Sequence, residues 1–99
     1  MTRVAYELAG RPAALVVDLA DAAAGWRIGN REAQVTDVLA LAPADEVARL
    51  IRHALTEIRA HAAANAAGSE QLRRLAAEVW RDYRRTIAGV GEQSRLPGV

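Results

Sequence analysis

Two stretches in the second half of the chain repeat apolar residues at intervals of three and four, the spacing that places side chains on one face of an α-helix. The first stretch spans residues 43–64, and its apolar positions are Val47, Leu50, Ile51, Ala54, Leu55, Ile58 and Ala62. Pro43 suits the first helical position, and Asp45 and Glu46 put negative charge in the first turn, where the helix dipole favours it. This pattern predicts a helix about 33 Å long.

A second helix is predicted from Ser69 to residue 88. Ser69 is a favourable N-cap residue, and Gly68 can take the left-handed conformation that ends the preceding helix. Gly89 is expected to end the second helix. Its apolar stripe consists of Leu72, Leu75, Ala76, Val79, Trp80, Tyr83 and Ile87. Because the connection is short, the two helices should lie side by side and antiparallel.

The first forty residues alternate apolar and polar positions, which is typical of β-strands. A turn at Gly10-Arg11 predicts a first hairpin, and a turn at Gly29-Asn30 predicts a second one. The expected cross-strand pairs are Leu8 with Ala13, Tyr6 with Leu15, Val4 with Val17, Arg27 with Glu32, and Trp26 with Ala33.

Residues 13–24 and 34–42 also fit helical spacing, so the pattern leaves strand and helix open there. The sequence therefore predicts an α+β fold, in which N-terminal β-hairpins or a meander pack on a C-terminal antiparallel helical hairpin. The alternative is an all-α arrangement of four helices. Residues 1–88 are expected to form one domain, and residues 89–99, which lack periodicity, a disordered tail.

The composition excludes some classes of function but does not identify one. The 99 residues carry a net charge of +1, all thirteen basic residues are arginine, and cysteine is absent. We interpret the arginine and alanine excess as codon bias of a GC-rich genome. The N-terminus lacks the apolar core of a signal peptide, and no apolar run is long enough to span a membrane, so a cytoplasmic protein without membrane contact is expected.

The sequence contains few residues that could form a catalytic site or a metal site. His53 and Glu57, or Glu57 and His61, are four residues apart and could share a metal ion, but two ligands do not complete a site. We interpret these residues as the solvated flank of the helix. No serine lies in a nucleophile elbow, and no glycine-rich phosphate loop precedes a helix. Neither a cofactor nor enzymatic activity is expected.

The sequence predicts a binding or adaptor module that acts through protein–protein contacts of its helical hairpin. It also predicts self-association, because four short strands are expected to be too few to cover both apolar stripes. The expected contact residues are Leu50, Ile51, Leu55, Ile58, Trp80 and Tyr83. The alternative partner is nucleic acid, bound by Arg74, Arg81 and Arg85 of the second helix. Glu78 lies among these arginines, which favours an ion-paired surface instead.

Overall fold

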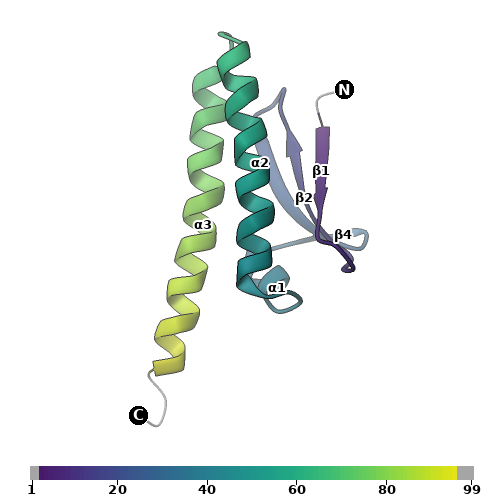
Figure 1. The fold of residues 1–99 in the computed structure, drawn as a ribbon, viewed down its shortest axis with the longest axis vertical. Helices are drawn as coiled ribbons and strands as arrows, with labels where there is room; N and C mark the ends of the chain where they lie inside the picture. Colours follow the sequence, from purple (N-terminus) through teal and green to yellow (C-terminus); the bar gives the residue numbers. More distant parts are fainter. Residues whose placement is uncertain (1–2, 96–99) are drawn as a thin grey trace.

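The fold is seen in a computed structural model that describes residues 3–95, with side chains described for residues 3–89. Within these residues the chain forms four strands and then three helices. The strands are β1 (Arg3–Glu7), β2 (Ala13–Asp18), β3 (Ala23–Ile28) and β4 (Arg31–Ala33), and the helices are α1 (Val35–Leu39), α2 (Ala44–Ala64) and α3 (Ser69–Arg95). The strands form an antiparallel sheet in the order β1–β2–β3–β4, and α2 and α3 stand side by side on one of its faces (Figure 1).

The predicted hairpins are confirmed, and the all-α alternative is wrong. The observed partners include Val4 with Val17, Tyr6 with Leu15, Trp26 with Ala33, and Arg27 with Glu32. The fifth predicted pair is also present, because the N–H of Leu8 donates to the carbonyl of Ala13 at 3.0 Å. Both turn glycines have a positive φ, 75° at Gly10 and 62° at Gly29, which only glycine adopts without strain.

The two ambiguous stretches differ in outcome. Residues 13–24 form β2 and the beginning of β3, whereas residues 35–39 form the short helix α1. Asp37 stabilises the start of α1, since its carboxylate accepts a hydrogen bond from the N–H of Gln34 at 2.9 Å. Val35 and Val38 are buried on its inner side, as helical spacing requires.

The helix ends deviate from the sequence-based expectation. Pro43 is the N-cap of α2 rather than its first residue, and the carbonyl of Gly68 accepts the N–H of Leu72, which makes Gly68 rather than Ser69 the cap of α3. The predicted end of α3 at Gly89 is wrong, because the helix continues to Arg95. A single glycine costs a helix only about 1 kcal/mol and does not end it. Residues 96–99 of the predicted tail lie outside the described residues.

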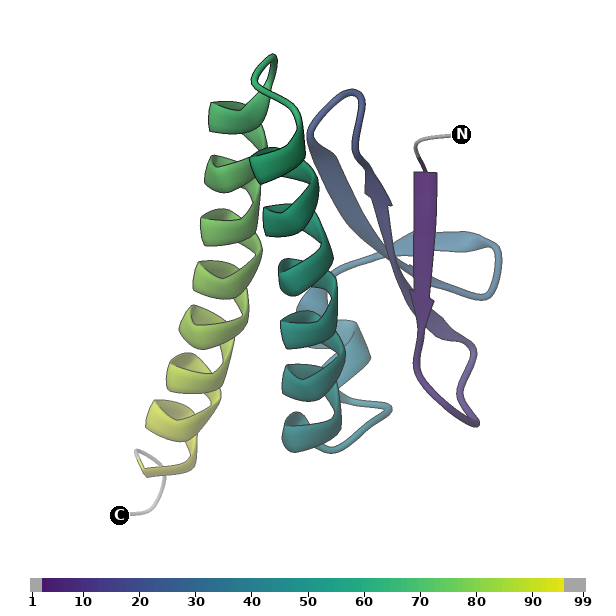
Figure 2. The same ribbon diagram turned by 45° about the horizontal axis from the view of Figure 1, so that its top comes forward.

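The two long helices cover one face of the sheet (Figure 2), and the buried core consists of residues of the sheet and of the helices. Every second side chain of a strand points toward the helices, where it packs against the apolar side chains of α2 and α3. Six larger side chains have less than 2% of their surface exposed: Leu15, Val17, Val38, Val47, Ile51 and Ile58. The other face of the sheet is open to solvent and carries small or charged residues, among them Ala5, Glu7, Gly25 and Arg27.

Candidate interaction surface on the helical hairpin

The predicted contact residues separate into three groups in the structure. Ile51, Leu55 and Ile58 are at most 4% exposed and pack inside the chain. Leu50 is partly exposed on the side of α2 that faces β1. Trp80 and Tyr83 are partly exposed where α2 and α3 meet. The buried group cannot touch a partner, so only the other two groups remain available for one.

Trp80 forms the centre of a small ordered patch. Its ring stacks on that of Tyr83, with centroids 5.3 Å apart and an interplanar angle of 29°. The guanidinium carbon of Arg52 lies 5.5 Å from the centroid of Trp80, a cation–π contact between α2 and α3. The hydroxyl of Tyr83 donates to the carbonyl of Ala44 at 3.1 Å. These contacts hold both aromatic side chains in place although they are partly open to solvent.

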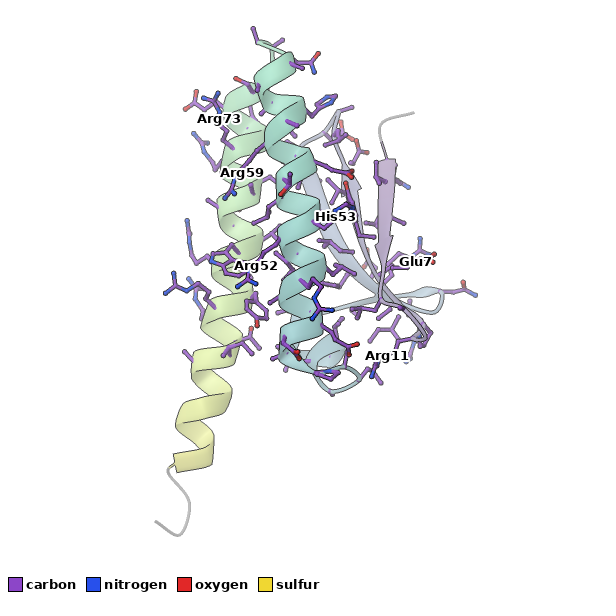
Figure 3. All side chains as sticks on the ribbon, viewed as in Figure 1. Glu7, Arg11, Arg52, His53, Arg59 and Arg73 are labelled. Carbon is purple, nitrogen blue, oxygen red and sulfur yellow. The ribbon has the colours of Figure 1, made fainter. Side chains whose placement is uncertain are left out.

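Exposed arginines surround this patch, on the side of the helix pair that faces away from the sheet. Arg52 and Arg59 are seven residues apart on α2, hence about 10.5 Å apart along one side of the helix. Figure 3 shows Arg73, Arg59 and Arg52 following one another down the helix pair. Arg84 lies one turn beyond Trp80 on α3. We call this surface the arginine face and define it by Arg52, Arg59, Arg73 and Arg84 with Trp80 and Tyr83.

The arginines of this face form no ion pair with any carboxylate whose side chain the structure describes. Among the residues whose side chains the structure describes, four ion pairs have N–O distances within 4.0 Å, and none includes an arginine of this face. The four pairs are Arg3–Asp18, Arg11–Glu46, His53–Glu57 and Arg74–Glu70. Several cations are thus gathered on one surface and form no ion pair with a described carboxylate, an arrangement that favours an anionic partner.

The three arginines predicted for nucleic acid lie elsewhere on α3. Arg74 has its carboxylate partner in Glu70, with Nη2 and Oε1 3.3 Å apart. Glu78 has no basic side chain within 4.0 Å among the described side chains, so the expected ion-paired centre does not form around it. Arg85 lies at a hollow of about 740 Å³ between α3 and the sheet, together with Asp82. Arg74, Arg81 and Arg85 therefore do not belong to the arginine face, and their role in binding nucleic acid stays a prediction.

The polar residues on the flank of α2 include a contact that the sequence did not indicate. The hydroxyl of Tyr6 on β1 donates to Glu57 Oε1 at 2.6 Å, and His53 Nε2 lies 3.3 Å from Glu57 Oε2. The ring of Tyr6 also meets that of His53 edge-on, with centroids 5.6 Å apart. Burial, and secondly the hydrogen bond to Glu57, raise the pKa of Tyr6 well above its usual range. This cluster ties β1 to α2.

No group of three or more His, Asp or Glu residues that could hold a metal ion occurs in the part of the chain that the structure describes. Within the same part, no helix combines the length and apolar character needed to cross a membrane. Comparisons with models of known protein families, with curated proteins and with solved structures found no match to this chain.

Proposed function

We propose that this protein is a non-enzymatic binding module that holds an acidic protein partner on the arginine face of its helical hairpin. The observation that carries the proposal is the set of exposed arginines around the Trp80–Tyr83 stack, which form no ion pair among the described side chains. Trp, Tyr and Arg are the residue types that contribute most to protein–protein affinity. Because stacking already restricts Trp80 and Tyr83, less conformational entropy is lost when a partner covers them.

The chemistry of this face selects against a second copy of the same face. Two arginine faces brought together would oppose like charges, which disfavours a symmetric contact through them. The sequence predicted self-association because the apolar stripes of the two helices were expected to be left uncovered. In the structure, Ile51, Leu55 and Ile58 of the α2 stripe are buried within the chain. Self-association stays a prediction, and it requires a surface other than the arginine face.

Nucleic acid is a second candidate partner, because unpaired guanidinium groups also suit phosphates. Trp80 already contacts Tyr83 and Arg52, so less of its ring is open to stack on a base. Binding would therefore depend on charge and not on sequence. We rank an acidic protein first because the aromatic pair adds apolar contact area beside the charges.

The test compares two triple variants with the same change in net charge. The first reverses the arginine face with Arg52→Glu, Arg59→Glu and Arg73→Glu. The control reverses three arginines of α3 outside the arginine face, with Arg74→Glu, Arg81→Glu and Arg85→Glu. Each protein is immobilised and exposed to a nuclease-treated lysate of the source cells, and mass spectrometry identifies the proteins that it retains. Circular dichroism verifies that each variant folds.

An acidic protein retained by the native chain and by the control, but lost from the arginine-face variant, would support the proposal. Equal loss from both variants would attribute retention to net charge and contradict it. Fluorescence anisotropy with mixed-sequence duplex and single-stranded oligonucleotides tests the second candidate. Micromolar binding that weakens about 10-fold or more between 50 and 200 mM salt, and that only the arginine-face variant loses, would place nucleic acid first.

A further inference from the structure

The sheet has one long open edge. Its strand order leaves β1 and β4 as the two outer strands, and β4 has three residues whereas β1 has five. Figure 1 shows β1 at the side of the sheet remote from α3. Short edge strands resist pairing with other chains, but a five-residue edge offers a row of backbone donors and acceptors to another strand. β1 is therefore the edge at which strand addition is possible.

The backbone groups that face outward can be assigned from the hairpin. Leu8 and Ala13 are hydrogen-bonded partners across the first turn, with the N–H of Leu8 donating at 3.0 Å. In an antiparallel pair, successive residues direct their N–H and C=O groups alternately toward and away from the neighbouring strand. With the observed register, every second residue before Leu8 also faces β2. The outward-facing residues of β1 are therefore Arg3, Ala5 and Glu7.

Helix α2 leaves this edge accessible. A hollow of about 440 Å³ runs between β1 and α2, and all five consecutive residues 5–9 line it, as do four residues of α2: Glu46, Arg49, Leu50 and His53. A lining of consecutive residues means that the backbone edge itself borders the hollow, because side chains of one face alone would alternate. Leu50 is the apolar residue that α2 contributes there, and it is partly exposed.

We infer that two copies of the chain pair antiparallel through β1, with Ala5 opposite the partner's Ala5, and thereby join their sheets into one. In this register the outward-facing residues of both copies meet as three hydrogen-bonded pairs, which adds about six backbone hydrogen bonds. The surface is distinct from the arginine face, and the inference does not depend on the proposed function.

The charges of β1 fit this register. Arg3 stands opposite the partner's Glu7, and by two-fold symmetry Glu7 stands opposite the partner's Arg3, all on the solvent face of the sheet. Figure 3 shows Glu7 directed away from α2. Shifting one strand by four residues would instead oppose Arg3 to Arg3 or Glu7 to Glu7. The order of charges therefore favours one register, with apolar Val4 opposite the partner's Tyr6 on the helix face.

The first test is the solution mass with and without the outward N–H of Ala5. Light scattering of the native protein at about 50 µM should give twice the chain mass of 10.6 kDa. Ala5→Pro removes an N–H that no neighbouring strand uses within the monomer, and proline is tolerated at such edge positions. We expect this variant to be a 10.6 kDa monomer with native helix content by circular dichroism. A monomeric native protein, or a dimer that Ala5→Pro leaves intact, would overturn the inference.

A charge swap tests the register. Arg3→Glu and Glu7→Arg each place like charges opposite each other at two symmetric positions, which should raise the dimer Kd roughly 10- to 30-fold. The double variant restores opposite charges and should bind more tightly than either single variant. Arg3 Nη2 also lies 3.8 Å from Asp18 Oδ2, so full recovery is not required. A double variant weaker than both single variants would contradict the register.

Cross-linking locates the two-fold axis directly. The sequence contains no cysteine, so Ala5→Cys introduces the only thiol. Directly opposed residues of a hydrogen-bonded pair have Cα atoms about 5.5 Å apart, within reach of a short bis-maleimide linker. Ala14→Cys is the matched control, because Ala14 lies on the same sheet face one strand further in. The inference expects covalent dimers from Ala5→Cys and few from Ala14→Cys, and the reverse result would reject it.

Discussion

The tie between β1 and α2 gives a quantitative prediction for Tyr6→Phe, which deletes one hydroxyl. The Tyr6 side chain is 7% exposed, and its hydroxyl donates to Glu57 Oε1 at 2.6 Å. A hydrogen bond to a charged group contributes about 1.5–3 kcal/mol. The side chain of Glu57 is 49% exposed, so water can replace part of the lost bond. We therefore expect Tyr6→Phe to lower the free energy of unfolding by about 1.5 kcal/mol.

Tyr83→Phe is the matched control for this prediction. It deletes a hydroxyl that donates to the neutral, exposed carbonyl of Ala44 at 3.1 Å, so a loss of only about 0.5 kcal/mol is expected. Urea unfolding at pH 7, followed by far-UV circular dichroism and extrapolated linearly to water, measures both values. In thermal unfolding, Tyr6→Phe should lower the Tm by about 6–12 °C. Equal losses in the two variants would refute the charge-assisted bond.

Three further predictions follow from burial and backbone geometry. The pKa of Tyr6 is raised in the folded state, so the stability linked to its protonation is present below about pH 10 and is lost as the pH rises above that value. Urea unfolding between pH 8 and 11 should therefore show that the native protein loses stability more steeply than Tyr6→Phe. Ile58→Ala should lower the free energy of unfolding by about 3 kcal/mol because Ile58 is fully buried, whereas Leu41→Ala, at a 44% exposed position, should lower it by less than about 0.5 kcal/mol. Similar urea midpoints for the two variants would contradict this. Gly29→Ala forces a non-glycine residue to φ 62° and should cost about 1–2 kcal/mol, while Gly25→Ala, in a strand with open space around it, should not destabilise; thermal unfolding distinguishes the two.

The fold was accessible from the sequence because its signals are local. Gly10 and Gly29 mark turns that require positive φ, and once a turn is placed, the register of both strands follows from it. The helices follow from apolar spacing alone. Residues 34–42 were ambiguous, since their helix depends on the short-range contact between Asp37 and the N–H of Gln34. From the sequence alone, an Asp three residues after a Gln is only weak evidence for the start of a helix.

The candidate site was only partly accessible, because it depends on which helix faces meet. The sequence identified Trp80 and Tyr83 but grouped them with Ile51 and Ile58, which are completely buried in the core. The sequence did not indicate Arg52, because its cation–π contact is with Trp80 on the next helix, and that contact depends on how the two helices pack. Arginines seven residues apart on one helix were the available signal. Their significance depends on the neighbouring helix, which adds Arg73 and Arg84 to the same surface.

Together, the two inferred surfaces predict that the binding of a partner with two acidic segments depends on dimerisation. Side chains of one face of β1 meet side chains of the same face in the paired strand, so both helix layers lie on the same side of the joined sheet. Both arginine faces then lie on that same side of the joined sheet, on the outer surfaces of the helices. A partner with two acidic segments could engage both copies, and its second contact would be intramolecular, which raises affinity about 100-fold or more. Ala5→Pro should remove this gain without altering any arginine, and it should not weaken a partner with a single acidic segment. Isothermal titration of an acidic peptide and its tandem repeat against both proteins measures the difference. Equal affinities of the tandem peptide for the native protein and for Ala5→Pro would show that the two surfaces do not cooperate.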